Sequence, residues 1–509
     1  MLKKVFIIFM ALLCICSTGC TKFGKNKKGD DINPSTPVPK MGGVANIACF
    51  TPDTLNPLIT KYANVNDVLM LVYEGLFTAN EDLSVNPVLA ESFTVSTSNK
   101  IYTIKLKSGI KFHDGTDFDA EDVIATLNYL KSYNTTYNHC ISQILSYEAK
   151  DSRSVSLELI NPQPDFMAVM DFPVLPSGLT SVSFADESQA FIPNGTGKFK
   201  YDSSKQMRGI TLKRNADYYD SPAYINQINV QYLDDSESIY NSFNSGELDM
   251  ITTSDLVWGE FSFSADIKSF ETGSGNYTFI GVNHKNPFLS DRETRKAILN
   301  AINKKELTEA VVFKHGITAD TPVIGTSHYA GNLIDDVKDD GQINTRYEQT
   351  LYVLFNEESD EKRRIAGFLQ KSLDKIGIKL VFSETDFNTY LEKIKNDDYE
   401  LYIGEVNMAN NMNMDFMFDE VLKTDQNLCN FESDEFTSLI TNYNLGTKDA
   451  ESTKINYSNL VNYFNGYVPQ IPLYHKTRAL YVNSKIKGNI KPNMSNYYGD
   501  VGDFYIKYN

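Results

Sequence analysis

Cys20 is the residue whose surroundings point most directly to covalent chemistry. Lys3 and Lys4 form a short positive segment near the start of the sequence, residues 5–15 form an apolar run too short to span a bilayer, and small residues from Ser17 onward lead to the cysteine. In bacterial lipoprotein signals, a cysteine in this place takes a diacylglyceryl group on its thiol before cleavage, although leucine is usual where Ser17 stands. The pattern therefore predicts a signal peptide over residues 1–20 and a lipidated Cys20. An ordinary secretory signal or an uncleaved anchor is the alternative.

Histidines, the side chains most often used as general bases or metal ligands, are dispersed along the chain. There are six of them, none stands at helical spacing from another, and no HExxH, GxSxG or GxxxxGK[ST] motif is present. His113 and Asp114 could be drawn as a base and its orienting acid, but a strand end entering a turn is the simpler interpretation. We therefore expect no catalytic residue, no metal site and no cofactor.

Charge and length limit the classes of protein further. A net charge of −17 argues against a nucleic-acid partner, because such a protein needs a basic face. The 509 residues exceed the roughly 250–300 that one hydrophobic core can serve, so at least two lobes are expected. Residues 21–40 have almost no large apolar side chains and predict a solvated tether behind Cys20. Cys49, Cys140 and Cys429 are scattered and odd in number, which predicts no disulfide framework.

Strand and helix patterns alternate along the rest of the chain, which predicts an α/β fold with more than one domain. Residues 101–107 alternate apolar and polar side chains, as expected of a half-buried strand, and Asp114-Gly115 is a tight-turn pair. Apolar periodicity and capping signals predict helices over residues 68–74, 119–129, 236–245, 291–302 and 363–376.

One long stretch carries a specific set of landmarks, VYEGLFTANEDLSVNPVLAESF followed by IYTIKLKSGIKFHDGTDFDAEDVIATLNYL. Further motifs follow in order: NGTGKF at 194–199, NADYY at 215–219, SGELD at 245–249, FIGVN at 279–283 and PQIPLYH at 469–475. Together they resemble the landmarks of the bacterial extracellular solute-binding proteins of family 5, the oligopeptide-, dipeptide- and nickel-binding group. Lys198 departs from the pattern, because proline is usual there. The resemblance covers essentially all of residues 42–509.

The resemblance implies a two-lobe periplasmic-binding-protein-like α/β fold of the class II, cluster C type, with an extra subdomain on the first lobe. The first lobe would comprise residues 41–63, 190–273 and 477–509, the inserted subdomain residues 64–189, and the second lobe residues 274–476. Two chain crossings, near residues 273–283 and 474–481, would form the hinge. The landmark motifs, His113 and Asp114 included, would be scaffold rather than ligand contacts.

The function implied is capture of oligopeptides between the lobes and their delivery to the permease subunits of an ABC importer, without catalysis. The protein would be a monomer on the outer face of the cell membrane, held to the lipid bilayer by acyl chains such as palmitate at Cys20. Alternatives are the same fold with another solute (a nickel chelate, haem or an oligosaccharide), a peptide-sensing surface receptor, or a cell-wall hydrolase.

In peptide-binding members of this family, the peptide lies extended between the lobes and pairs with backbone from both. Carried over to this chain, one edge would be Ile59, Thr60 and Lys61, and the other Gly404, Glu405 and Val406. Residues 400–404 have a strand pattern that ends at glycine, which permits close approach of a ligand backbone.

The chain departs from the family where a peptide's amino terminus would bind. Glu405 stands in place of the family's tryptophan, and Met408 stands at about the position of its amine-binding aspartate. A buried ammonium needs a counter-charge, so either Glu405 or Asp415 replaces that aspartate, or the ligand has no such amine. The methionines of this segment would form an adaptable ligand surface or ordinary core: Met408, Met412, Met414 and Met417.

Overall fold

The computed structural model describes residues 39–133, 135–163, 165–180, 191–205, 208–254, 266–329, 346–414, 433–445, 450–499 and 501–507. Cys20, Trp258, Asp415, Met417 and Cys429 lie outside the described residues.

An 11-stranded sheet runs through the described part of the chain in the order β15-β14-β16-β12-β17-β11-β1-β10-β9-β8, with β13 beside β17. Its strands are β1 (Val44–Phe50), β8 (Phe199–Ser204), β9 (Gly209–Arg214), β10 (Gln227–Leu233), β11 (Met250–Thr253), β12 (Ile267–Val282), β13 (Gly316–Thr318), β14 (Gln349–Asn356), β15 (Ile378–Thr385), β16 (Leu401–Asn407) and β17 (Gln470–Asn483).

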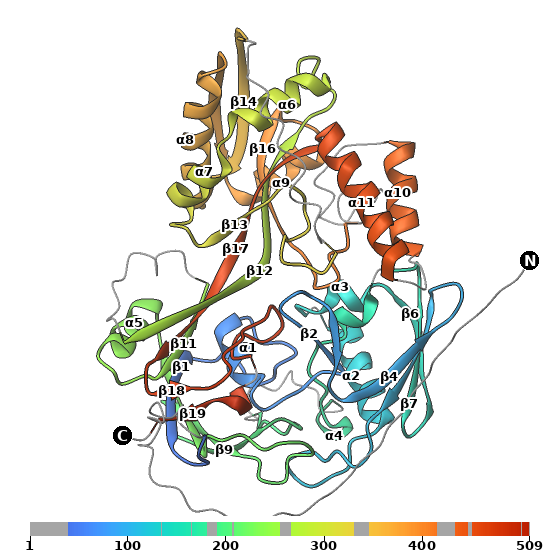
Figure 1. Cartoon of the computed structure of the whole chain (residues 1–509), viewed down its shortest axis with the longest axis vertical. Coiled ribbons are helices and arrows are strands. Elements are labelled where there is room, and N and C mark those ends of the chain that lie inside the picture. The colour runs from blue at the N-terminus through green and yellow to red at the C-terminus, as the bar shows by residue number, and fades with distance from the viewer. Residues whose placement is uncertain are drawn as a thin grey trace, which may run out of the picture. The chain divides into compact units, whose positions relative to one another are not determined.

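Two long neighbouring strands, β12 and β17, join the two ends of this sheet (Figure 1). They pair antiparallel, with a register shift between Gly273 and Tyr277. Gly275 lies inside this break with φ of 81°, a backbone conformation that side-chain-bearing residues rarely adopt. The break falls at the start of the first predicted hinge crossing.

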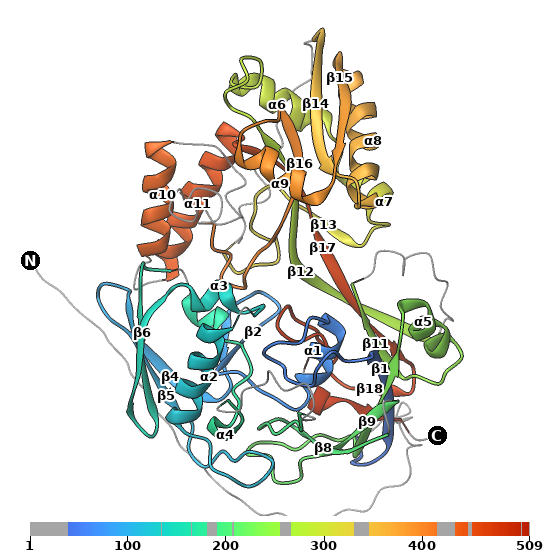
Figure 2. The same cartoon turned by 180° about the vertical axis from the view of Figure 1, so that it is seen from behind.

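The first half of the fold is built on β1, which pairs in parallel with β10 and β11 and contacts α1 (Ala63–Leu69). An antiparallel four-stranded sheet, β4-β5-β7-β6, stands beside it: β4 (Ala90–Val95), β5 (Ile101–Leu106), β6 (Ile144–Asp151) and β7 (Ser154–Leu159). Helix α2 (Ala120–Ser132) packs on this sheet (Figure 2). Ile47 of β1, Ile104 of β5 and Leu127 of α2 belong to one hydrophobic core.

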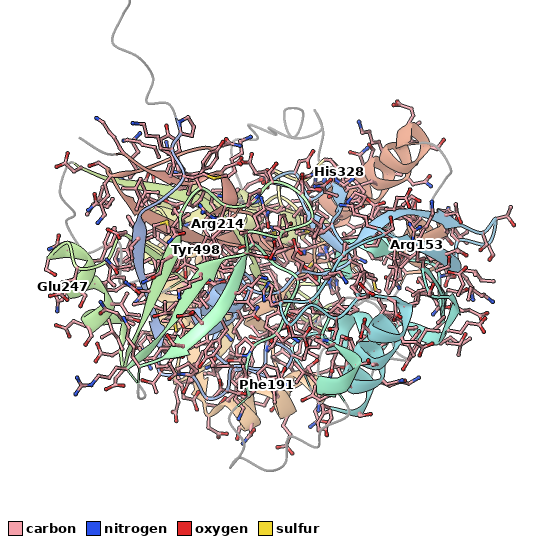
Figure 3. The ribbon with its side chains drawn as sticks, turned by 90° about the horizontal axis from the view of Figure 1, so that it is seen from below. Arg153, Phe191, Arg214, Glu247, His328 and Tyr498 are labelled. Atoms are coloured by element: carbon pink, nitrogen blue, oxygen red, sulfur yellow. The ribbon has the colours of Figure 1, made fainter. Side chains whose placement is uncertain are left out.

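Smaller elements complete the first half. They are the hairpin of β2 (Phe77–Ala79) and β3 (Val85–Pro87), the pair β18 (Ile486–Lys487) and β19 (Tyr505–Ile506), and helices α3 (Asn138–Ile141), α4 (Ser177–Thr180) and α5 (Ser236–Asn244). Figure 3 shows Arg153, in the turn between β6 and β7, and Glu247, just after α5, at opposite sides of the view.

The second half is built on β14, which runs parallel to β15 and β16. Its helices are α6 (Arg292–Ala301), α7 (Lys304–Val311), α8 (Asp360–Asp374), α9 (Phe387–Lys395), α10 (Asp434–Leu445) and α11 (Ala450–Tyr467). Residues Ile365 and Leu369 of α8 share a buried core with Leu401 and Ile403 of β16. Tyr402, which points to the other face of β16, belongs to a second core with residues of α9, α10 and α11.

Most predicted helices and strands are confirmed within one to three residues. The helix expected over residues 68–74 is wrong: α1 ends at Leu69, upstream of most of that range. The backbone that follows is used for packing instead, because the carbonyls of Leu71 and Val72 accept hydrogen bonds from the amides of Phe199 and Gly197. Among the described residues, no helix combines the length and the apolar character needed to cross a membrane.

Candidate functional site

Strand β16 carries three of the residues predicted to bind ligand, Gly404, Glu405 and Val406. Its apolar alternation buries Leu401 and Ile403 against α8, and Glu405 follows them on the same face, where that core ends. The Glu405 side chain is 31% exposed, so it lies at the margin of the core and reaches solvent.

The outer edge of β16 is unpaired over the predicted ligand segment. Strand β12 pairs with β16 along its whole length, from Leu401 to Asn407. On the other side, β14 pairs only with Leu401 and Tyr402, and no other described strand continues the ladder. An unpaired strand edge can accept an added strand from a ligand.

Gly404 is buried between aromatic rings of its own lobe. A Cβ atom at this position would lie 2.6 Å from Cζ of Phe279, so the glycine is needed for this packing. The close approach of a ligand backbone is therefore not required to explain it.

Glu405 is already paired with a cation of the protein. Its carboxylate lies 2.6 Å from Nζ of Lys476 on β17, and the same ammonium lies 2.7 Å from the carboxylate of Glu361 in the first turn of α8. The hydroxyl of Tyr474 donates a 2.6 Å hydrogen bond to Glu361. Burial opposes the charge on Lys476, but the two carboxylates outweigh it and raise the lysine pKa.

Lys362 adds a second ammonium to this group. Its Nζ atom lies 4.4 Å from the ring centroid of Tyr390, whose hydroxyl donates a 2.8 Å hydrogen bond to the carbonyl of Ile403 on β16. Burial lowers the Lys362 pKa to about 8, although the charges of Glu405 and Glu361 oppose that change. We call Glu361, Lys362, Glu405 and Lys476 the lysine–glutamate cluster.

The other predicted edge, Ile59 to Lys61, is a turn rather than a strand. The carboxylate of Asp53 accepts hydrogen bonds from the Thr60 hydroxyl (2.7 Å) and the Lys61 amide (3.0 Å). The amides of Ile59 and Thr60 both donate to the carbonyl of Asn56. Since the three amides are used internally, a ligand could pair with this segment only through its carbonyl oxygens.

Strand β17 links the two predicted edges. Helix α1 follows the Ile59 turn, and its buried Asp67 forms an ion pair with Arg478. Arg478 stands two residues beyond Lys476, so both side chains lie on the same face of β17, about 7 Å apart along the strand. No described contact joins Ile59, Thr60 or Lys61 directly to Gly404, Glu405 or Val406.

The methionines of the described segment belong to the core. Met408, Met412 and Met414 are at most 3% exposed and pack together with Phe279 and Tyr402. This burial favours the interpretation as ordinary core for these three. Asp415 and Met417 lie outside the described residues.

The landmark motifs hold the scaffold together, as expected. Nε2 of the half-buried His113 lies 2.9 Å from the carbonyl of Gly197, and burial lowers the His113 pKa to about 4. Glu74 accepts hydrogen bonds from Tyr218 (2.5 Å) and Thr196 (2.8 Å), and burial raises its pKa. Glu74 also lines a cavity of about 760 Å³ in the first half of the fold, which contains none of the predicted ligand residues.

Side chains also connect the first half of the fold to the second half. His328, labelled in Figure 3, places Nδ1 3.0 Å from the carbonyl of Asp82 and Nε2 3.1 Å from the carboxylate of Asp165. Asn410 donates a 2.8 Å hydrogen bond to Asp171. Among the described residues, no group of three or more His, Cys, Asp or Glu side chains could hold a metal ion.

Sequence reasoning missed the partners of Glu405. Lys476 directly follows the PQIPLYH motif, and strand alternation from Tyr474 places it on the same face as Arg478, so a search for lysines beside that motif could have found it. Glu361 and Lys362 lie in a helix start that was expected three residues later, and only the tertiary packing of α8 on β16 brings them to the site.

Known proteins support this description of the fold. The chain is 23% identical over 432 residues to the oligopeptide-binding protein AppA of Bacillus subtilis, covering 79% of this chain and 78% of AppA. It is 28% identical over 359 residues to the glutathione-binding protein GsiB of Escherichia coli, covering 65% of this chain and 67% of GsiB.

Solved structures show the same fold. The ABC transporter substrate-binding protein CtaP of Listeria monocytogenes matches with a TM-score of 0.74 at 20% identity, covering 92% of this chain and 100% of CtaP. AppA of B. subtilis in complex with a nonapeptide matches with a TM-score of 0.64 at 19% identity, covering 92% of this chain and 100% of AppA. The model of the bacterial extracellular solute-binding proteins, family 5 (middle region), matches residues 84–427, and the chain therefore belongs to this family of two-lobe solute-binding proteins.

Proposed function

We propose that this protein captures oligopeptides for an ABC importer, with the ligand lying along the outer edge of β16. The observation that carries the proposal is the unpaired edge of β16. Strand β14 pairs with β16 only as far as Tyr402, whereas β12, on the other side, pairs with it as far as Asn407. Backbone pairing at such an edge binds an extended chain with little regard to its side chains, which suits a peptide cargo. AppA of B. subtilis, which is named for oligopeptide binding and was solved in complex with a nonapeptide, supports the same cargo.

The proposed ligand contacts are the backbone of Gly404, Glu405 and Val406 and the carbonyls of Ile59, Thr60 and Lys61. The two sets would approach the ligand from different lobes, with residues 41–63, 190–273 and 477–509 in one lobe, 64–189 as its inserted subdomain and 274–476 in the other. Strand β17 supports this arrangement. It carries Lys476, the partner of Glu405, and two residues later Arg478, the partner of Asp67.

The first test is native mass spectrometry on the soluble form that begins after Cys20. The protein is measured as purified, after mild unfolding and refolding, and again after addition of a peptide mixture. We expect a heterogeneous set of peptides that is lost on unfolding and regained from the mixture. An apo mass that ignores peptides contradicts the peptide cargo and leaves the family assignment intact; nickel chelates, haem and oligosaccharides are then the next probes.

The proposal extends to the membrane. Acylation of Cys20, followed by the polar segment 21–40, would hold a monomeric, non-catalytic binding protein close to its permease. Cys20→Ser is expected to move the protein from the membrane fraction to the medium and to remove the acyl mass from the mature amino terminus. A membrane-bound Cys20→Ser protein without acyl mass would instead indicate an uncleaved anchor.

A further inference from the structure

The lysine–glutamate cluster leaves no excess negative charge for a ligand amine. Glu405, which stands in the site segment, shares the ammonium of Lys476 with Glu361 at 2.6 and 2.7 Å. The two carboxylates of the cluster are matched by two ammonium groups, of Lys476 and Lys362. An incoming ammonium would have to displace Lys476, whose side chain is only 15% exposed, from both carboxylates.

Lys362 is the member of the cluster that has no carboxylate from the described part of the chain in direct contact with its ammonium, although Glu405, Glu361 and Glu358 act on it from further away. Its ammonium forms no ion pair or hydrogen bond with the described residues, and the ring of Tyr390 lies close to it. It also lies in the first turn of α8, where the helix dipole disfavours a cation. A carboxylate from outside the protein would offset both costs. Glu405, Glu361 and Glu358 offset them only in part, because burial still lowers the Lys362 pKa to about 8.

Lys362 is linked to the unpaired edge of β16 through one residue, Tyr390. Its ammonium lies over Tyr390, and the hydroxyl of Tyr390 is bonded to the carbonyl of Ile403, the residue at which the ladder with β14 has ended. Glu405 lies two residues further along the strand on the same face. A peptide paired with β16 would thus bring its own charged groups close to this lysine.

We propose that the protein recognises a carboxylate of its peptide ligand at Lys362 and does not require a free amino terminus, because Lys476 already supplies the ammonium that Glu405 and Glu361 bind. This inference rests on the proposed function and names the class of peptide: ligands with an exposed carboxylate, including those whose amino terminus is blocked. Glu405, the candidate counter-charge for a ligand amine, then has a different role, that of holding Lys476.

The test uses one pentapeptide library without Asp or Glu, prepared in four forms: free ends, acetylated amino end, amidated carboxyl end, and both ends blocked. Binding to the soluble protein is measured by isothermal titration calorimetry. We expect acetylation to change the affinity by less than about twofold and amidation to lower it by about tenfold or more. An amidated library with one Asp per peptide regains affinity if an acidic side chain can supply the carboxylate.

Lys362→Met is expected to lower the affinity for the free library about tenfold and to make the free and amidated libraries bind equally. Lys371→Met, which removes an exposed lysine of the same helix, is the matched control and keeps the preference for a free carboxyl end.

Three outcomes overturn the proposal while leaving peptide capture intact: acetylation abolishes binding, amidation has no effect, or Lys362→Met retains the preference for a free carboxyl end. Failure of all four libraries to bind overturns peptide capture itself and this inference with it.

Discussion

Two cations of β17, Lys476 and Arg478, stand two residues apart, and their ion pairs differ in how far they are exposed to solvent. Arg478 and Asp67 form a one-to-one pair whose side chains are 11% and 6% exposed, and Thr252 and Tyr497 pack around it at 2.7 Å from Asp67 and 3.7 Å from the guanidinium. The lysine–glutamate cluster has two cations and two carboxylates, and Glu405 is 31% exposed. A closed pair fixes the position of α1, whereas in the partly exposed cluster Lys362 has no direct ion-pair partner among the described residues and can bind a carboxylate of a ligand.

The largest expected effect comes from breaking the closed pair. Asp67→Asn leaves Arg478 buried without its partner, which costs about 3–5 kcal/mol in the free energy of unfolding. Urea unfolding of the soluble form measures this loss. Asp53→Asn is the control, because Asp53 is exposed and its change weakens only hydrogen bonds, from Thr54, Thr60 and Lys61, worth about 1 kcal/mol each. If the two variants lost the same free energy of unfolding, the buried Asp67–Arg478 pair would contribute no more to stability than the exposed Asp53.

The open cluster is expected to respond to pH instead. With its pKa at about 8, Lys362 is mostly charged at pH 7 and mostly neutral at pH 9, so affinity for a carboxylate falls roughly tenfold between these values. Glu358, Glu361, Glu405, Lys476, Tyr390 and Tyr474 are the other titratable groups around it. Glu405 and Glu361 raise the Lys476 pKa, so that lysine stays charged in this range. Calorimetry at both pH values measures the loss of affinity. If the affinity of the Lys362→Met protein falls equally between pH 7 and pH 9, a group other than Lys362 causes the pH dependence.

Glu405→Gln distinguishes the two roles of the carboxylate by the sign of its effect. Loss of Glu405 also lowers the Lys362 pKa, so the comparison is made at about pH 6, where Lys362 stays charged. There, removing a negative charge near Lys362 is expected to strengthen binding of a peptide carboxylate about two- to fivefold, since charges at partly exposed sites interact weakly. The same variant would weaken binding strongly if Glu405 held the ligand's ammonium. Calorimetry with the acetylated and free libraries decides between these results, and Asp386→Asn, an exposed cap of α9, is the control for a general charge effect.

The smallest effect is expected for His328, a third charged contact that lies away from β17. Burial lowers its pKa, but the hydrogen bonds and charges of Asp165 and Asp82 outweigh burial and raise it above the ordinary value of about 6.5. The contribution to stability is therefore fully present below about pH 6.5 and is lost as pH rises through the folded-state pKa. The thermal midpoint of His328→Gln should approach that of the wild type at high pH, and a constant difference would mean that the contact is not proton-linked.

The sequence predicted the fold well because its landmarks are local. The turn at Gly115, the cap of α2 at Asp119 and the alternation of β5 follow from neighbouring residues, so they could be recognised without tertiary information. Residues 68–74 could not, because their backbone is drawn into hydrogen bonds with Gly197 and Phe199, more than a hundred residues away.

The site was predicted less completely for a related physical reason. The segment 404–406 could be located from its strand pattern and its resemblance to the family, but the charge state around Glu405 depends on α8 and β17 meeting over it. The lone glycine gave a misleading signal, since the space at Gly404 is filled by Phe279 and not reserved for a ligand. The residue type at Met408 suits both a hydrophobic core and a ligand surface, so only its burial in the structure favours one of them.

The place of β17 in the sheet also determines the order in which the molecule can be assembled. It lies between β11 and β12, so until residues 470–483 have emerged the two ends of the sheet have no strand in common. A growing or translocating chain therefore cannot complete either the Asp67 pair or the Glu405 pair, whose cations are both on this strand. The protein remains unfinished until almost its whole length is available, which suits a family whose members do their work outside the cell.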